Sequence, residues 1–348
     1  MGWHIVCYGI DKFLVKHQFK VRQSAFSWGW LSMSTHHKWS VPTILDCDPG
    51  HDDALAIMLA AASAELNLIA VTTVAGNGGI ERVTDNALRV CALAGIDNIR
   101  IAQGARNPLL SPATGAKSIH GESALDGAEL PPPRLVLERI GAVDLIADIV
   151  SSAKDPVTLI ATGPLTNIAL FIKMHPQLLI KINCISLMGG STDRGNWTPL
   201  AEFNIWADPE AADIVFQSSI NIFMTGLNIS HQVLITKEIF SRLRGLDTHL
   251  SRTINPLLQF FAHTYDTVFG MPYPPLHDPI AVFAVSHPEL MTFMECNVSV
   301  EKNGTLTRGA TVVDIHGVTG KPSNAKVAIG IDVDAFWYHM IQAIKELG

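Results

Sequence analysis

The chain has 348 residues, of which 48% are hydrophobic and 16% charged, so it can bury a large core and is not an intrinsically disordered segment. Its formal net charge of −7 argues against a nucleic-acid-binding protein, because phosphates require clustered Lys and Arg. The apolar runs are shorter than the roughly 18 residues that a membrane-spanning helix needs, so we expect no membrane span.

The first forty residues differ in composition from the rest, and we expect them to form an extension outside the fold. Residues 1–40 hold four of the seven Trp and five Lys or Arg, but only one acidic residue, Asp11. The segment lacks the long apolar stretch and the small-residue cleavage site of a secretory signal. A basic, acid-poor transit peptide and a native translation start at Met33 are two explanations for it.

The five cysteines show no pairing pattern. They are scattered, without a CxxC pair, at Cys7, Cys47, Cys91, Cys184 and Cys296. An odd and irregular set is typical of reduced thiols that serve as small core residues. We therefore expect a reducing compartment, which indicates a cytoplasmic protein.

From Val41 onward, short apolar runs rich in Val, Ile and Leu alternate with longer helical stretches. We expect strands at 43–48, 66–76, 157–163, 182–190 and 221–229, with helices at 52–63, 81–95 and 165–174. Continuous apolar strands separated by helices indicate an open, mostly parallel sheet with helices on both faces. Because no Gly- or Ser-rich linker divides them, residues 41–348 are expected to form a single α/β domain.

The C-terminal third is less regular. We expect helices at 257–270 and 278–286, a strand at 325–334 and a final helix at 335–347. Residues 297–315 predict two strands joined at Asn303-Gly304, a dipeptide typical of a hairpin turn.

Four carboxylates lie within eight positions at the end of the first expected strand. They are Asp46, Asp48, Asp52 and Asp53, in the string DCDPGHDD. Like charges this close raise one another's pKa unless a cation joins them. A helix N-terminus could neutralise the second pair, but it does not account for the first pair, which ends the strand. The cluster therefore predicts a divalent metal site, and its hard oxygen ligands favour Ca²⁺ or Mg²⁺ over Zn²⁺.

Other polar residues are expected at the same edge of the sheet, because ligands bind at the carboxyl ends of parallel strands. Asn77, Thr162 and the loop after Met188 follow strands in this way. The pair His277-Asp278 precedes an apolar helix and offers a further carboxylate with an acid or base, although a single His is more often structural.

Glu202 and Asn204 alternate along one side of an expected extended segment. A carboxylate and an amide suit a polyol, whose hydroxyls both donate and accept hydrogen bonds. An exposed loop carboxylate is the alternative interpretation of Glu202.

Several strings between Thr43 and the C-terminus resemble the inosine–uridine-preferring nucleoside hydrolase family. In order, they are DCDPGHDDALAI, TTVAGN, IHGESALDG, ATGPLTNIAL, LMGG, GNWTPLAEFNIWADPEAA, GLNISHQ and LHDP. One string alone would be moderately specific, whereas the ordered set makes coincidence implausible. The resemblance implies a Rossmann-like nucleoside hydrolase fold and hydrolysis of the N-glycosidic bond of ribonucleosides to ribose and free base.

The resemblance also implies a role for each matching residue. The implied Ca²⁺ ligands are Asp48, Asp53, Asp278 and the backbone carbonyl of Thr162, with water and the ribose 2′- and 3′-hydroxyls in the remaining positions. The implied substrate-binding residues are Asp46, Asn77, His120, Met188, Asn196, Glu202, Asn204 and His277. Asp46 would contact the ribose or support the metal site, and Met188 would form part of the pocket wall. His120 and His277 match histidines near the leaving base.

In the implied mechanism, Ca²⁺ holds the ribose diol and a water whose pKa it lowers. Asp52 matches the general base and takes the proton of that water as it attacks the anomeric carbon, through an oxocarbenium-like transition state. His277 is expected to donate to the leaving base. The family tends towards homodimers and homotetramers, so a homo-oligomer that serves nucleoside salvage is also implied.

The preference for pyrimidine or purine bases stays open. Trp197 could stack on the base or serve only as packing. Tyr265, Phe269 and Tyr273 lie where relatives place specificity-determining side chains, but the Gln and Tyr of some pyrimidine-specific relatives are missing. The segment around them equally predicts a simple amphipathic helix.

Two alternative functions share part of this pattern. A haloacid-dehalogenase-type phosphatase also carries DxD after a strand, but it requires Thr or Val two residues after the second Asp and a phosphate-binding Lys. Here Pro49-Gly50 follows instead. A non-catalytic protein that binds Ca²⁺ and nucleosides could keep the pocket, but it would not require Asp52.

Overall fold

The strand β1 (Val41–Cys47) is apolar along most of its length and is buried on both faces of a sheet. Its adjacent residues Ile44 and Leu45 point to opposite faces and enter two separate hydrophobic cores. The structure is a computed structural model and describes residues 40–111 and 115–348. The predicted N-terminal extension, residues 1–40, lies outside these residues except for Ser40.

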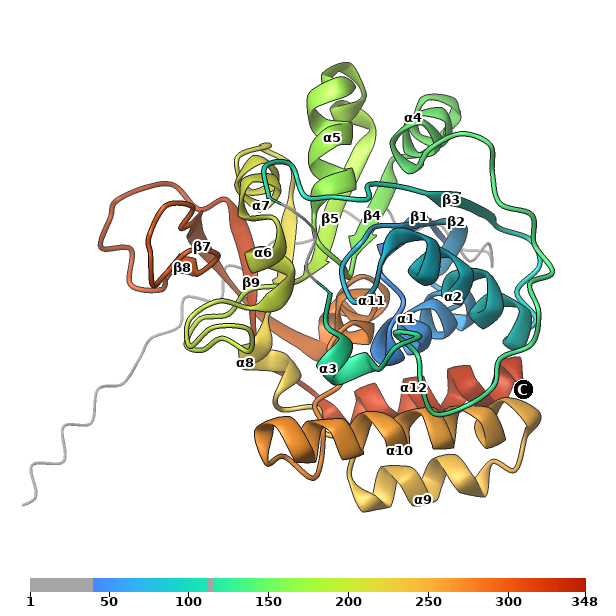
Figure 1. Cartoon of the computed structure of the whole chain (residues 1–348). Coiled ribbons are helices and arrows are strands. Elements are labelled where there is room, and N and C mark those ends of the chain that lie inside the picture. Colours follow the sequence, from blue (N-terminus) through green and yellow to red (C-terminus); the bar gives the residue numbers. More distant parts are fainter. Residues whose placement is uncertain (1–39, 112–114) are drawn as a thin grey trace, which may run out of the picture. The chain divides into compact units, whose positions relative to one another are not determined.

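Nine strands form one sheet in the order β3-β2-β1-β4-β5-β6-β9-β7-β8 (Figure 1). The other strands are β2 (Leu66–Thr73), β3 (Arg100–Gln103), β4 (Val157–Ala161), β5 (Ile182–Met188), β6 (Ile222–Thr225), β7 (Met291–Val300), β8 (Thr311–Asp314) and β9 (Ala325–Ile331). Neighbouring strands from β3 to β9 are parallel, whereas β7 runs antiparallel to β9 and β8. The predicted mostly parallel sheet is confirmed.

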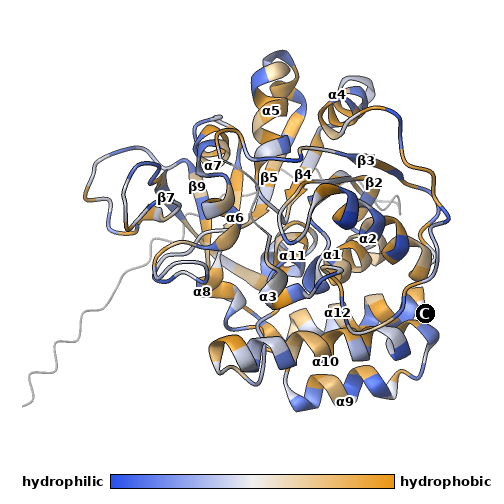
Figure 2. Ribbon diagram, viewed as in Figure 1, coloured by the Kyte–Doolittle hydropathy of each residue, from blue (hydrophilic) through white to orange (hydrophobic). Residues whose placement is uncertain are grey.

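Helices cover both faces of the sheet, as predicted. One core joins the sheet to α1 (His51–Ala62), α2 (Ile80–Leu93), α10 (His249–Phe269), α11 (Pro279–Ser286) and α12 (Val333–Leu347). The other core joins it to α4 (Ala142–Ser152), α5 (Thr166–Met174) and α7 (Pro209–Phe216). Figure 2 shows hydrophobic residues along the central strands β4 and β5, which lie between these two layers.

Short helices and one surface helix complete the described chain. They are α3 (Lys117–His120), α6 (Phe203–Ala207), α8 (Leu227–Ser230), α9 (Lys237–Gly245) and the 3₁₀ helices η1 (Pro176–Lys181) and η2 (Pro288–Leu290). The described residues form one compact unit. Within residues 40–111 and 115–348, no helix has both the length and the apolar character needed to cross a membrane.

Two sequence predictions were wrong in detail. The strand expected over 221–229 is β6, which ends at Thr225, because the chain turns at Gly226 into the helix α8. β7 and β8 form the expected antiparallel pair. The connection between them, residues 301–310, is a long loop rather than a tight Asn-Gly turn. Ion pairs explain this loop: Lys302 pairs with Asp213 and Arg308 with Glu210, so the connection is held against α7.

The carboxyl ends of β1 and β4 meet at one edge of the sheet. β1 and β4 are neighbours in the sheet. The connection after β1 leads to β2 on one side, and the connection after β4 leads to β5 on the other side. Asp46 pairs with Ala161 in the ladder, which brings the residues that follow, Asp48 and Thr162, together. Such a switch point is where open α/β sheets bind ligands.

Candidate active site

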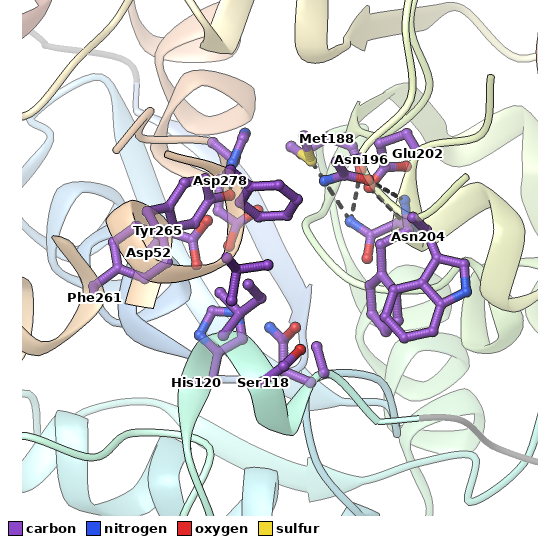
Figure 3. A pocket seen from close by; sticks show the side chains of 18 of the residues that line it. Asp52, Ser118, His120, Met188, Asn196, Glu202, Asn204, Phe261, Tyr265 and Asp278 are labelled. Carbon is purple, nitrogen blue, oxygen red and sulfur yellow. Dashed lines mark hydrogen bonds between the residues drawn. The ribbon is translucent and has the colours of Figure 1, made fainter. Parts of the chain in front are cut away.

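A cavity of about 270 Å³ opens at this edge of the sheet. Most of the predicted site residues line it, namely Asp52, Asn77, His120, Thr162, Met188, Asn196, Glu202, Asn204, His277 and Asp278. Asp46, Asp48 and Asp53 are also predicted site residues and are buried, but they do not line the cavity. Figure 3 shows Asp52 and Asp278 on one side of the cavity and Met188, Glu202 and Asn204 on the opposite side.

Asp53 is fixed by hydrogen bonds at the N-terminus of α1. Its carboxylate accepts hydrogen bonds from the backbone N–H of Gly50 at 3.0 Å and from the Thr162 hydroxyl at 2.8 Å. The amide of Asn77 donates a third at 3.2 Å. These donors come from three segments, so the folded sheet edge, and not the local sequence alone, sets the position of this carboxylate.

Asp48 lies in a tight backbone setting. Its Oδ2 accepts a hydrogen bond from the backbone N–H of Asn77 at 2.7 Å. A Cβ atom added at Gly76 would lie 2.0 Å from Asp48 Oδ2, and one added at Gly163 would lie 2.6 Å from Oδ1. Neither position can therefore hold a side chain without moving the carboxylate.

The acidic residues fit a hard divalent cation. Asp52, Asp53 and Asp278 each offer a carboxylate oxygen, and these oxygens lie within 4.8 Å of one another. Asp48 lies outside this trio, but its Oδ1 and the Oδ1 of Asp52 are buried without a hydrogen-bond partner. Buried anionic oxygens without partners are costly unless a positive charge approaches them. Among the described residues, no Lys or Arg forms an ion pair with this group.

Burial dominates the electrostatics of the cluster. Burial and, to a smaller extent, the neighbouring charge of Asp53 together raise the pKa of Asp52 from 3.8 to about 7. Burial also raises the pKa of Asp48, Asp53 and Asp278, and repulsion from neighbouring carboxylates adds to the rise for Asp48 and Asp278. A bound cation would reverse these shifts by favouring the ionised carboxylates.

Asp46 supports the site from behind. Its Oδ1 accepts hydrogen bonds from the Thr72 hydroxyl at 2.5 Å and the Asn167 amide at 2.8 Å, while its Oδ2 has no partner. Because Asp46 does not line the cavity, its position fits the supporting role among the two that the resemblance implied. Neither Thr72 nor Asn167 was anticipated from the sequence.

The wall opposite Asp52 is held by Glu202 and Asn204. Glu202 is buried and caps the helix α6, accepting hydrogen bonds from the backbone N–H groups of Gly190, Asn204 and Ile205. The alternative of an exposed loop carboxylate is therefore wrong. The extended segment expected for Glu202 and Asn204 is also wrong, because residues 203–207 form α6. The Asn204 amide donates to the backbone carbonyl of Thr162 at 2.7 Å, and a carbonyl oxygen has a second lone pair for another partner.

Replacing Glu202 by glutamine is expected to lower the free energy of unfolding by about 1–3 kcal/mol. The new amide NH₂ would face a backbone N–H in either orientation, because both carboxylate oxygens accept such hydrogen bonds. Urea denaturation at a fixed calcium concentration measures the change. Glu210→Gln is the control, since Glu210 lies on the next helix and pairs with Arg308 near the surface; an equal loss in both variants would contradict the capping role.

Aromatic side chains from α10 form the other end of the cavity. Phe261, Tyr265 and Phe269 line it, whereas Tyr273 does not. Trp197 also lines the cavity and at the same time packs on Phe203 and Trp206, with ring centroids 5.2 and 5.0 Å away. Both interpretations of Trp197 are thus compatible with its position.

Both ring nitrogens of His277 have protein partners. Nε2 lies 2.7 Å from the Tyr265 hydroxyl, and Nδ1 lies 2.8 Å from the Ser230 hydroxyl. Burial lowers the pKa of His277 to about 3 and raises the pKa of Tyr265, so both groups are neutral near pH 7. Tyr265 was expected only as a specificity residue. Its bond to His277 joins α10 to the segment before α11 and has no local sequence signal.

Two histidines, His51 and His120, contact each other at the start of α1. Nδ1 of His51 lies 3.1 Å from Nδ1 of His120, and Nε2 of His51 lies 2.7 Å from the carbonyl oxygen of Asp126. The two rings also stack on Phe261. His51 was not among the predicted site residues, although it stands inside the DCDPGHDD string.

Comparison with known proteins gives one consistent family. Residues 43–338 match the family described as inosine-uridine preferring nucleoside hydrolase. A pyrimidine-specific ribonucleoside hydrolase RihA from Shewanella sp. (strain MR-4) is 47% identical over 85% of this chain and 94% of its own. A purine-preferring ribonucleoside hydrolase from Gardnerella vaginalis has a similar structure, with a TM-score of 0.82 and 33% identity over 88% of this chain and 98% of its own. A plant nucleoside hydrolase, PpNRh1, gives a TM-score of 0.83 and 31% identity, covering 88% of this chain and 99% of its own.

Proposed function

This chain belongs to the inosine-uridine preferring nucleoside hydrolase family, and we propose that it releases the base from pyrimidine ribonucleosides at the cavity described above. As a member, it is an N-glycosidase of ribonucleosides: water adds to the anomeric carbon, the bond to the base nitrogen breaks, and ribose and free base result. The unpartnered Oδ1 of Asp52, at a cavity lined by Glu202 and Asn204, carries the proposal. The phosphatase alternative is wrong, because the family match covers residues 43–338.

The proposed cation is Ca²⁺, held by Asp48, Asp53, Asp278 and the backbone carbonyl of Thr162. The close approach of Asp53 and Asp278, and the unpartnered oxygen of Asp48, support this assignment. When bound, such an ion supplies a positive charge that fixes the ribose diol and increases the acidity of a water. The hard oxygen donors favour Ca²⁺ or Mg²⁺ over softer metals.

Asp52 is the proposed general base. Its Oδ1 has no protein partner, so it is available to accept the proton of the attacking water. As the bond to the base breaks, positive charge develops on the ribose, and the carboxylates of Asp52 and Glu202 stabilise it from the cavity walls. One base at the water is sufficient, so the proposed reaction is a direct displacement.

Tyr265 is the proposed donor to the leaving base, with His277 behind it. Tyr265 lines the cavity, and both nitrogens of His277 are already bonded to protein hydroxyls. With Nε2–H of His277 donating to the Tyr265 oxygen and the Ser230 hydroxyl donating to Nδ1, the phenolic proton is free to pass to the departing base. After the products leave, the proton that Asp52 took from the attacking water returns through water in the cavity to the Tyr265 oxygen. The role expected for His277 is therefore exerted through Tyr265.

Tyr265→Phe is expected to lower kcat on uridine about 100-fold while changing turnover of p-nitrophenyl riboside little. A nitrophenolate leaves without being protonated, whereas the uracil anion needs a donor. Steady-state kinetics with both substrates measure the contrast. Phe269→Leu is the packing control, because Phe269 contacts Tyr265 without a hydroxyl; equal losses on both substrates in Tyr265→Phe would contradict the donor role.

A reducing-sugar assay on inosine, adenosine, uridine, cytidine and their 2′-deoxy forms tests the proposed function as a whole. Pyrimidine preference is proposed because the RihA relative, at 47% identity, is closer in sequence than the purine-preferring structure, at 33%. We expect uridine and cytidine to be hydrolysed fastest and the 2′-deoxy forms to be poor substrates. Faster release of purines would overturn the preference, and binding without release of any base would favour the non-catalytic alternative.

We further propose a cytoplasmic homo-oligomer, a dimer or tetramer, that acts in nucleoside salvage. The free, buried state of Cys47, Cys91, Cys184 and Cys296 supports a reducing compartment. Sedimentation analysis of the purified protein tests the oligomeric state, and a monomer at micromolar concentration would contradict it.

A further inference from the structure

The contact between His51 and His120 requires a defined arrangement of protons. Nε2 of His51 lies 2.7 Å from the carbonyl oxygen of Asp126, which can only accept a hydrogen bond, so Nε2 carries a proton. The His51 ring is buried and stacks on Phe260 and Phe261, and neither of its nitrogens bonds a carboxylate in the described chain. It is therefore the neutral form with one proton, and its Nδ1 is an acceptor.

The partner ring must then hold its proton on the shared side. Nδ1 of His120 lies 3.1 Å from Nδ1 of His51, so His120 Nδ1–H donates into that contact. The opposite assignment would set two lone pairs against each other at 3.1 Å. The backbone N–H of His51 also points at this nitrogen, at 3.4 Å, and would donate to it if Nδ1 were unprotonated. The ring contact at 3.1 Å is shorter, so we assign the proton of His120 from the His51 ring rather than from the backbone.

The other nitrogen of His120, Nε2, is the ring nitrogen left available to the cavity. The Nδ1 and Cε1 edge packs against Gly50, where an added Cβ would lie 2.6 and 2.7 Å from these two atoms. His120 lines the cavity, and within the described chain its Nε2 has no protein partner. An unprotonated ring nitrogen is thus presented to the ligand beside Phe261 and Tyr265, at the base end.

We propose that His51 is a positioning residue that fixes the tautomer of His120, so that Nε2 of His120 accepts a hydrogen bond from an N–H group of the pyrimidine base. The inference rests on the proposed function and adds to it a residue that decides which bases fit. His51 does not touch the substrate; it acts through the proton on His120.

A fixed acceptor distinguishes uracil from cytosine. Uracil presents a donor at N3 and an acceptor at O4, whereas cytosine presents an acceptor at N3 and a donor at N4. An acceptor at Nε2 of His120 therefore matches uracil if it faces position 3 of the base, and cytosine if it faces position 4. In either case it matches only one of the two bases. A site built to accept a hydrogen bond rejects a group that cannot donate it.

The first test reads the tautomer directly, without substrate. Protein labelled with ¹⁵N-histidine gives ring-nitrogen shifts that separate N–H from unprotonated nitrogen, and His120→Gln assigns the signals. We expect His120 to carry its proton on Nδ1 in the wild type. In His51→Phe, the backbone N–H of residue 51 remains as a donor to Nδ1, so the proton should move to Nε2. A wild-type His120 protonated on Nε2 would overturn the proposal, whatever the protein hydrolyses.

The second test measures kcat/KM for uridine and cytidine at one pH. The ratio should shift by about tenfold towards the disfavoured base in His51→Phe, which keeps a ring for stacking but loses both nitrogens. Phe260→Leu is the control, because Phe260 stacks on His51 without lining the cavity, and it should leave the ratio unchanged. An unchanged ratio in His51→Phe, or an equal shift in the control, would overturn the role in base selection.

A ribose hydroxyl is the other possible donor to His120, and 5′-deoxyuridine distinguishes it. Under the proposal, removing the 5′-hydroxyl costs the wild type and His51→Phe equally. A cost that disappears only in His51→Phe would show that the ribose is the donor and overturn the assignment to the base. Failure of the protein to hydrolyse any nucleoside would contradict the proposed function, while the tautomer measurement would still stand or fall separately.

Discussion

Replacing Asp52 by asparagine is expected to lower kcat about 1,000-fold on every nucleoside that the protein hydrolyses, while the bound cation is retained. The amide has nearly the same shape as the carboxylate but cannot take a proton from water. Oδ1 of Asp52 has no protein partner, so the substitution breaks no hydrogen bond of that atom. Initial rates of reducing-sugar release and the metal content of the purified variant are the two measurements.

Asp208→Asn is the matched control for this experiment. Asp208 is another fully buried carboxylate, but it caps α7 and accepts hydrogen bonds from Thr166 and Leu109 away from the cavity. Its substitution should leave kcat within a few-fold of the wild type. Normal turnover in Asp52→Asn would refute the assignment of the base. Loss of metal in Asp52→Asn would instead show that Asp52 is a metal ligand. The metal content is measured for this reason, because Asp52 lies close to Asp53 and Asp278.

Removal of the divalent cation is expected to abolish turnover and to lower the melting temperature. Without the cation, the carboxylates of Asp48, Asp53 and Asp278 remain buried and close together with no positive charge between them. A ligand present at about 100 times its Kd stabilises the folded state by about 2.7 kcal/mol. EGTA treatment followed by titration with Ca²⁺ or Mg²⁺ should restore both properties together; full activity after chelation would refute the metal role.

The stabilisation by the cation should also depend on pH. Burial raises the folded-state pKa of Asp46 and Asp52 from 3.8 to about 7 in the ion-free protein. These groups bind a proton more tightly when folded, so their contribution to stability is complete below about pH 4 and is lost as pH rises through about 7. The calcium-dependent rise in melting temperature should therefore be larger at about pH 8 than at about pH 5. Calorimetry would contradict this if the rise were equal at both.

The sequence predicts the sheet and the acidic cluster because both depend on local patterns. β1 and the start of α1 follow from an apolar run that ends in DCDPGHDD, and Asp48, Asp52 and Asp53 fall close together as a result. The strand β3 was not anticipated, since its four residues give little periodicity. The helix α4 was also missed, although its eleven residues carry a helical spacing of apolar positions. The tight hairpin at Asn303-Gly304 was wrong because ion pairs to α7 hold a longer loop.

Contacts between distant segments could not be predicted in the same way. The nitrogens of His51 and His120 meet across 69 positions of sequence, and the Tyr265 hydroxyl of α10 reaches His277 in the segment before α11. Neither partner has a periodicity or spacing that signals the other. Such pairs follow only from the packed arrangement of α1, α3, α10 and the segment before α11.

The surroundings of Asp48 and the α10 end of the cavity differ in how well they tolerate substitutions. Gly76 and Gly163 leave no space for any side chain beside the Asp48 carboxylate, so the sugar end has one workable geometry. At the proposed base end, α10 contributes Val268 and Phe269, which are 46% and 41% exposed and can be exchanged without moving a backbone segment. Protein engineers who wish to alter the range of nucleosides should therefore leave both glycines and Tyr265, the proposed proton donor, untouched and vary Val268 and Phe269 at the exposed end of α10.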